Sequence, residues 1–264
     1  DELLAIKKSL NSERMSVIVD SDEQAENYQA PSEAEAVAYR DGVIVMNKDG
    51  QLRFMSPKVF STAKKDFGSY AEDMLPVQKL SVNNKGSLFA VTNLGSIVKI
   101  DVTTLPEKKF KEKPFKIGAI NQDVQTGETV VKLMFFEGVP VGELVLFTKQ
   151  GGAKRVDLSE FTEVSKTYLK AINLADKDTV IAAEIVDDEK NVMEITEQGQ
   201  VLVYKATEIP MQGRNAAGVK GIKLSDGDSV AFAGQVEDEG EIIVVSDTGY
   251  AKRVISSLID PSSR

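Results

Sequence analysis

The strongest constraint on the fold of this chain is a phrase that occurs five times. Each copy has an apolar run, a polar turn that ends in glycine, and a second strand-like run that often carries basic residues. The copies are VIVMNKDGQLRF (43–54), LFAVTNLGSIVKI (88–100), LVLFTKQGGAKRV (144–156), VMEITEQGQVLVY (192–204) and IIVVSDTGYAKRV (242–254). Their glycines are separated by 45, 56, 48 and 50 residues and are Gly50, Gly95, Gly151, Gly199 and Gly249. Regular spacing of this length is typical of a repeat architecture.

Each phrase predicts a β-hairpin, because aliphatic and β-branched residues flank a short turn whose glycine can adopt a positive φ. Two further strand-like runs lie between hairpins, seen best at 169–174 with 179–186 and at 219–224 with 229–236. The repeating unit is therefore four short strands. Five such units predict an all-β, five-bladed, propeller-like fold with four-stranded blades.

The two ends of the chain suggest how the ring of blades closes. The fifth hairpin is followed by few residues, whereas MSVIVD (15–20) and AVAYRDG (36–42) are strand-like runs before the first hairpin. We expect N-terminal strands to complete the last blade, which removes exposed sheet edges. Leu3, Ile6 and Leu10 predict a short N-terminal helix. The expected division is 1–14 for the end of a helix from an upstream domain, 15–34 for a connector and acidic linker, and 35–264 for the β domain.

The composition excludes many functions. The chain has no Cys, His or Trp, which rules out disulfides, zinc sites built on Cys or His, and histidine-based catalysis. No apolar run is long enough to cross a membrane and no signal peptide is present, so we expect a cytoplasmic protein with no membrane partner. The net charge of −9, taken alone, argues against a nucleic-acid partner.

Several motifs nevertheless resemble one family. They are the hairpins of T-x-x-G-x-x-K-R type at 148–155 and 246–253, the phrase GRNAAGVKGIKL (213–224), and ELLAIKKSLNSERMSVIVD (2–20). Together they resemble the C-terminal domain of the A subunit of bacterial type IIA DNA topoisomerases, which are DNA gyrase and topoisomerase IV. The resemblance implies a β-pinwheel, in which neighbouring blades exchange strands and the rim binds and bends double-stranded DNA.

The resemblance also implies what this chain lacks. The family's DNA-cleaving tyrosine lies in an upstream domain, and none of the six tyrosines here stands in a matching context. We therefore expect no catalytic site and no cofactor in this chain. The rest of the A subunit, the ATPase B subunit, ATP and Mg²⁺ would complete a chromosome-associated isomerase. The gyrase A box, Q-R-R-G-G-K-G, is absent after the first hairpin, where residues 61–67 read STAKKDF. That absence favours topoisomerase IV, with a gyrase-type DNA-wrapping domain as an alternative.

The charges follow the repeat. Fifteen residues after the glycine stand Lys65, Lys166, Arg214 and Arg264, and in the second unit Phe110 flanked by lysines. Equal positions in equal blades predict a basic belt along one edge, to which the hairpin cations add. Acidic clusters at 187–189 and 237–239 occupy a different position within the repeat. The predicted DNA-binding residues are Lys64, Lys65, Lys108, Lys109, Lys111, Lys154, Arg155, Lys166, Arg214, Lys220, Lys252, Arg253 and Arg264.

Two alternatives stay open at this point. The GRNAAGVKG loop (213–221) can bring its backbone close to a phosphate, or it can be a connection whose glycines only serve unusual backbone angles. The fold can also serve as a propeller-like scaffold that binds other proteins, which the overall acidity favours. A metal site has little support, because the isolated Asp-Gly-Asp at 226–228 is typical of a turn rather than a calcium loop.

Overall fold

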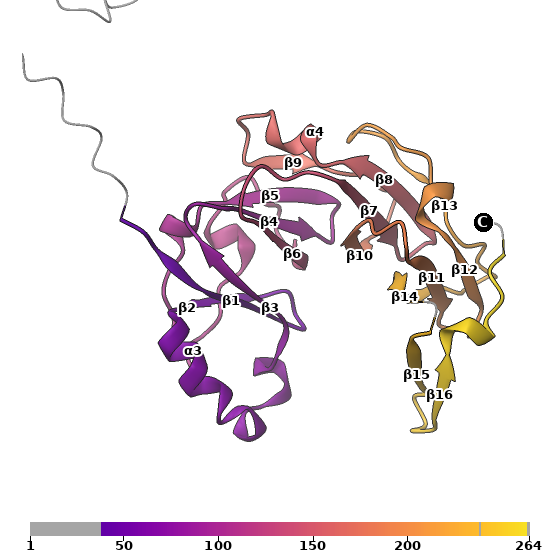
Figure 1. Cartoon of the computed structure of the whole chain (residues 1–264), viewed down its shortest axis with the longest axis horizontal. Coiled ribbons are helices and arrows are strands. Elements are labelled where there is room, and N and C mark those ends of the chain that lie inside the picture. The colour runs from indigo at the N-terminus through magenta and orange to yellow at the C-terminus, as the bar shows by residue number, and fades with distance from the viewer. Residues whose placement is uncertain (1–37, 238, 263–264) are drawn as a thin grey trace, which may run out of the picture. The chain divides into compact units, whose positions relative to one another are not determined.

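The computed structural model describes residues 38–237 and 239–262. The predicted N-terminal helix, the acidic linker, the strand at 15–20 and Arg264 lie outside the described residues. Residues Tyr39 to Arg264 form one compact unit, which is built mainly of short antiparallel strands (Figure 1). The prediction of an all-β protein is confirmed. In the described part, no helix is long and apolar enough to cross a membrane.

All five predicted hairpins are present. Each is an antiparallel pair of neighbouring strands. The pairs are β1 (Asp41–Asn47) with β2 (Leu52–Met55), β4 (Ser87–Thr92) with β5 (Ser96–Ile100), β7 (Glu143–Thr148) with β8 (Gly152–Asp157), β11 (Asn191–Thr196) with β12 (Val201–Lys205), and β15 (Glu241–Val245) with β16 (Ala251–Ile255).

One arrangement closes every hairpin turn. The polar residue three positions before the glycine accepts a hydrogen bond, through its side-chain oxygen, from the backbone N–H four residues ahead of it, at 2.8 to 3.1 Å. These acceptors are Asn47, Thr92, Thr148, Thr196 and Ser246. The glycine itself has a φ of 67° at Gly50 and 86° at Gly249, a backbone conformation that other residues adopt only with strain. The sequence repeat is therefore a repeat of one turn chemistry.

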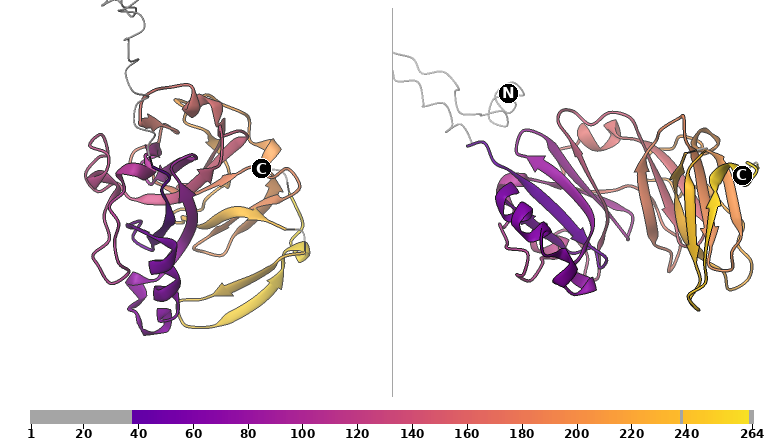
Figure 2. Two further views of the ribbon diagram at one scale, coloured as in Figure 1. Left: turned by 60° about the vertical axis from the view of Figure 1, so that its left-hand side comes forward. Right: turned by 60° about the horizontal axis from the view of Figure 1, so that its bottom comes forward.

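A third strand joins the first strand of four hairpins. These strands are β3 (Pro76–Asn83) on β1, β6 (Val130–Phe136) on β4, β10 (Val180–Ile185) on β7, and β14 (Val230–Val236) on β11. The third strands contact one another in chain order, β3 with β6, β6 with β10 and β10 with β14. Figure 2 shows the successive sheets lying face to face. Buried aliphatic side chains from neighbouring sheets form the core between them.

Neighbouring sheets also exchange strands. β9 (Tyr168–Lys170) follows β8 in the chain but pairs with β5 of the preceding sheet, and β13 (Val219–Lys220) follows β12 but pairs with β8. This is the exchange that the family resemblance implies. The runs at 169–174 and 179–186, which are neighbours within one predicted unit, are not paired with each other. Their strands belong to different sheets.

Two further expectations need correction. Within the described residues, the five sheets have three, four, four, three and two strands, so only two of them show the expected four. In the first sheet, the segment 107–115 borders β2 through isolated bridges at Leu52 and Phe54. Pro106 before the segment and Pro114 within it have no N–H for a longer ladder. Of the run 36–42, the described residues 38–42 do not supply a closing strand, because 38–40 lie outside any strand and Asp41 and Gly42 begin β1.

The helices are short, and none was predicted in the region that the structure describes. α3 (Pro57–Lys64) lies between β2 and β3, and α4 (Ser159–Thr162) follows β8. Pro57 at the start of α3 has a φ that suits a first helical turn. Single 3₁₀ turns occupy Phe67–Ser69, Glu72–Met74, Val102–Thr104, Ile117–Ala119, Ala206–Glu208 and Ser256–Leu258.

Candidate nucleic-acid interface

Lys154, one of the predicted DNA contacts, is buried. Its side chain has no exposed surface, and its ammonium group donates hydrogen bonds to the carbonyl oxygens of Ala171, Arg214 and Ala216 at 2.7, 2.8 and 3.0 Å. Three acceptors match the three protons of an ammonium group. The expectation that Lys154 faces a phosphate is therefore wrong: the lysine is an internal tie between β8 and two loops.

Burial lowers the pKa of Lys154 to about 8, and the nearby Glu160 carboxylate only partly opposes that shift. Between about pH 8 and 10.5, the Lys154 side chain is protonated in the unfolded chain but deprotonated in the folded protein. Unfolding free energy should therefore rise with pH in this window, by about 1 kcal/mol per pH unit near its centre. Chemical denaturation of the wild type and a Lys154→Met variant between these pH values measures the effect. The rise must be smaller in the variant, where Lys99, whose pKa is also lowered by burial, still contributes; equal slopes would contradict it.

The two hairpin arginines among the predicted DNA contacts are already paired. Arg155 forms an ion pair of 3.1 Å with Glu143 on the adjacent strand and has a largely buried side chain, and Arg253 forms the equivalent pair with Glu241, also at 3.1 Å. Because a neighbouring carboxylate offsets each guanidinium, these residues offer less to a phosphate than their motif suggests.

The glycines of the GRNAAGVKG loop serve packing. Gly218 has a φ of 86°, and a Cβ there would stand 2.7 Å from the carbonyl oxygen of Ala153. A Cβ at Gly221 would overlap a carboxylate oxygen of Glu194. The loop thus lies directly on the β8 backbone, where its carbonyl groups also hold Lys154. Of the two interpretations of this loop, the structure supports the one in which the glycines are structural.

Five predicted residues do come together, on and beside α3. Phe110 is buried, with its ring centroid 4.9 Å from that of Phe67 and 4.7 Å from that of Tyr70. These contacts hold the lysine-rich segment 108–113 against the end of α3, and the Lys111 ammonium lies 5.8 Å from the Tyr70 ring centroid. We call this surface the α3 patch, and it consists of Lys64, Lys65, Lys108, Lys109 and Lys111.

The patch is open to solvent. All of its lysines are exposed except Lys108, which is partly covered. The Lys108 ammonium nitrogen lies 3.9 Å from a carboxylate oxygen of Glu112. Phe110 occupies the position at which the four other units carry a cation, so the second unit places an aromatic anchor there and its cations on either side. The exposed Lys113 extends the patch. It was not among the predicted contacts, although the run KKFKEKPFK (108–116) is a direct signal for it.

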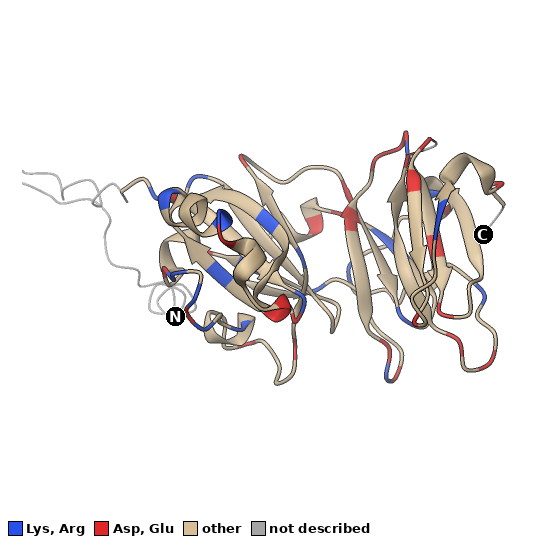
Figure 3. Ribbon diagram, turned by 90° about the horizontal axis from the view of Figure 1, so that it is seen from below, with Lys and Arg blue, Asp and Glu red and all other residues tan. Residues whose placement is uncertain are grey.

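The charge is divided between the two halves of the β domain. Residues 39–136, which include the first six strands, contain 15 basic and 10 acidic residues, whereas residues 137–264 contain 14 and 22. The net charges are +5 and −8. Figure 3 shows this as basic residues over the N-terminal sheets and acidic residues in the loops of the later ones. A nucleic acid would therefore meet the first two sheets most favourably.

The other candidates do not form one belt with the patch. Lys166 is exposed in the loop before β9, Arg214 is half-buried in the GRNAAGVKG loop, and Lys220 is exposed on β13. Lys252 is exposed on β16. All four lie in the acidic half. Cations at the same offset from the glycine therefore occupy equivalent positions in the repeat, but the net charge around them differs between the two halves.

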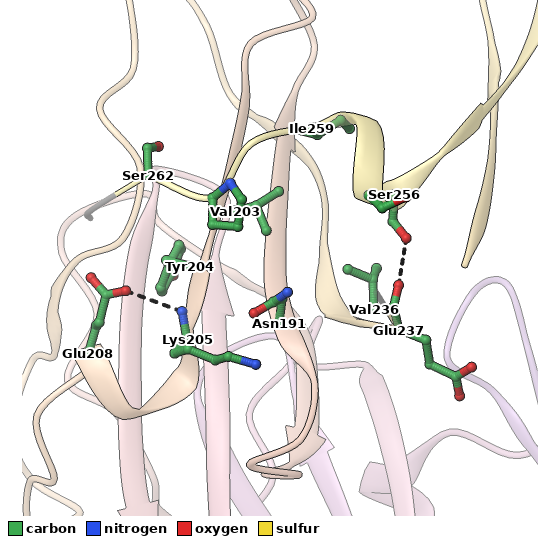
Figure 4. A pocket seen from close by; sticks show the side chains of 12 residues that line it. Asn191, Val203, Tyr204, Lys205, Glu208, Val236, Glu237, Ser256, Ile259 and Ser262 are labelled. Carbon is green, nitrogen blue, oxygen red and sulfur yellow. Dashed lines mark hydrogen bonds between the residues drawn. The ribbon is translucent and has the colours of Figure 1, made fainter. Parts of the chain in front are cut away.

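The hollows of the described part contain no catalytic arrangement. One of about 730 Å³ lies beside β12, where the segment 256–262 runs along that strand (Figure 4). The Ser262 N–H donates to the Val203 carbonyl at 2.9 Å, and the wall mixes apolar side chains with polar ones. Among the described residues, no group of three or more acidic side chains is arranged to hold a metal ion.

The geometry defines a class: an all-β, propeller-like domain whose sheets exchange strands. A family model, the DNA gyrase C-terminal domain, beta-propeller, matches residues 86–133, 142–187 and 190–237. The chain belongs to this family. It is 29% identical to the A subunit of DNA topoisomerase 4 from Bacillus subtilis over 267 residues, and 30% identical to the A subunit of DNA gyrase from Chlamydia muridarum over 195.

The matches cover this chain well and the relatives only in part. The two alignments include 100% and 70% of this chain but 32% and 23% of the relatives, so the chain spans about a third of the first. Among solved structures, the C-terminal domain of DNA topoisomerase IV superimposes with a TM-score of 0.75 at 24% identity, covering 86% of this chain and 71% of that one. The DNA gyrase A C-terminal domain gives 0.59 at 22%, covering 85% and 75%.

Proposed function

We propose that this chain is the non-catalytic, DNA-binding and DNA-bending C-terminal domain of a bacterial type IIA topoisomerase A subunit. The observation that carries the proposal is the α3 patch, a cluster of exposed lysines on the net-positive half of a domain of the gyrase C-terminal family. Lysines of this kind contact phosphates and read no sequence. The domain would hold a duplex and orient it for strand passage by the catalytic core.

We also propose that the domain is a five-bladed pinwheel closed by N-terminal strands. Five hairpins with one turn chemistry support five blades, and the two-stranded sheet of β15 and β16 has room for further strands. In the complete enzyme the partners would be the remainder of the A subunit, together with the ATPase B subunit, where ATP and Mg²⁺ are used. The missing gyrase box favours a topoisomerase IV type over a DNA-wrapping gyrase type.

A triple charge reversal tests DNA binding. In Lys64→Glu/Lys109→Glu/Lys111→Glu, we expect the affinity for a duplex of about 40 base pairs to fall at least about 100-fold at roughly 100 mM salt. The slope of log affinity against log salt should decrease by about 3, because three phosphate contacts are lost. Fluorescence anisotropy with the full chain measures both quantities.

The matched control reverses three exposed lysines in the acidic half. Lys170→Glu/Lys177→Glu/Lys223→Glu makes the same change in net charge, so a fall of only a few-fold is expected there. Equal losses in the two triple variants would show that net charge alone decides binding. A wild-type chain that fails to retain DNA at about 50 mM salt would refute the proposal and favour a protein-binding scaffold.

A further inference from the structure

Arg53 on β2 lies directly beneath the α3 patch. It is 3% exposed, its Nε–H donates a hydrogen bond of 3.0 Å to the carbonyl oxygen of Glu112, and its guanidinium lies 5.3 Å from the Phe110 ring centroid. A buried arginine with these partners cannot contact a phosphate itself. Both of its contacts are with the segment that carries Lys108, Lys109 and Lys111.

The same arrangement occurs at the next two hairpins. The half-buried Lys99 on β5 donates to the carbonyl oxygen of Val164, two residues before the exposed Lys166. Lys154 on β8 donates to the carbonyl oxygen of Arg214. In each case a hairpin cation three or four residues after the signature glycine binds backbone carbonyls of the following unit. Those carbonyls lie 13 to 17 residues after that unit's own glycine, where its surface cations also stand.

We infer that Arg53, Lys99 and Lys154 are positioning residues: inward-facing cations that fix the incoming segment of the next unit and thereby set where its exposed cations meet DNA. This inference rests on the proposed function. It divides the basic residues of the repeat into an internal set that orders the backbone and an external set that binds phosphate. The division explains why a T-x-x-G-x-x-K-R hairpin can carry charge without contacting DNA.

The physical basis is the poor solvation of a buried cation. A buried ammonium or guanidinium group needs several acceptors, and backbone carbonyls supply them without a competing negative charge. At the first hairpin the Lys108 N–H also bonds to the Phe54 carbonyl at 2.8 Å, and the N–H groups of Leu52 and Phe115 bond to each other's carbonyls at 2.8 and 2.9 Å. Arg53 adds a side-chain anchor between these backbone contacts, at the middle of the segment.

The test uses Arg53→Met in the full chain, with a duplex of about 40 base pairs as the probe. Loss of the anchor should speed amide hydrogen exchange in residues 107–116. DNA affinity should fall about tenfold, and the salt slope should decrease by about 2 although no surface charge was removed. Arg53→Lys can still donate to the Glu112 carbonyl, so it should recover most of the slope.

Lys252→Met is the control, because Lys252 holds the same position in the fifth hairpin and is exposed. It should leave exchange in 107–116 unchanged and lower the salt slope by no more than about 1. A folded Arg53→Met variant with wild-type exchange and slope would overturn the inference. If Arg53→Met does not fold, Lys99→Met applies the same criteria to residues 164–169. If the wild type does not bind DNA, the proposed function fails, and the exchange data alone decide the positioning role.

Discussion

Replacing Gly50 with alanine is expected to lower the free energy of unfolding by about 4 kcal/mol. Gly50 has a φ of 67°, and a Cβ there would overlap the carbonyl oxygen of Val130 at the start of β6, in the next sheet. The positive φ costs an alanine about 1 kcal/mol, and the clash with backbone costs the rest because a carbonyl in a sheet cannot move freely. Urea denaturation followed by circular dichroism measures the change.

Gly199→Ala is the matched control for this prediction. Gly199 occupies the same turn position with a φ of 83°, but a Cβ there would meet nothing within 4 Å. Its cost should be about 1 kcal/mol, from the backbone conformation alone. If the two variants lose the same stability, the contact between the first hairpin turn and the second sheet does not hold in solution.

Lys154→Met is expected to cost about 3 kcal/mol at neutral pH. Methionine fills a similar volume, but it leaves three buried carbonyl oxygens without their donor, and each unsatisfied group costs about 1 kcal/mol or more. The carbonyl oxygens left without a donor belong to Ala171, Arg214 and Ala216, so loops from two neighbouring units should loosen together. Thermal unfolding and hydrogen exchange of these loops measure the effect.

Lys252→Met tests whether burial, and not the motif, makes Lys154 important. Both lysines follow the same T-x-x-G or S-x-x-G turn at the same distance, yet Lys252 is exposed on β16. Its replacement should change the free energy of unfolding by less than about 0.5 kcal/mol. A near-neutral Lys154→Met variant would contradict the assignment of that lysine as an internal tie.

The local parts of this fold could be predicted from the sequence. Each hairpin can be recognised from a polar residue, a glycine three positions later and alternating apolar flanks, because the hydrogen bonds that stabilise the turn lie within five residues. The exchange of β9 and β13 could not be derived from periodicity, because pairing partners of a strand are set by distant residues; only the family resemblance implied it. α3 was not predicted because PKVFSTAK is only eight residues long and has no side-chain cap at its start.

The candidate site was predicted in part for the same reason. Lys64, Lys65, Lys109 and Lys111 were found because they are charged and near a fixed repeat position, and the structure places them on one exposed surface. Lys154 was misassigned because its burial depends on carbonyl groups up to 62 residues away, which no local motif records. The net charge of −9 also gave no sign of the basic half, because the excess of basic residues there is outweighed by the excess of acidic residues in the rest of the chain.

Strand exchange has a mechanical consequence. The segment 107–115 belongs to the second unit by chain connection but is bonded to β2 of the first sheet. Tension applied by a bent duplex at the α3 patch would therefore load two sheets at once. The hydrogen bonds that Leu52, Phe54 and the Arg53 side chain make with this segment would have to break before the segment could separate from β2. In the proposed complex with bent DNA, the interleaved order of the chain would thus help a small domain to resist the elastic recoil of the duplex.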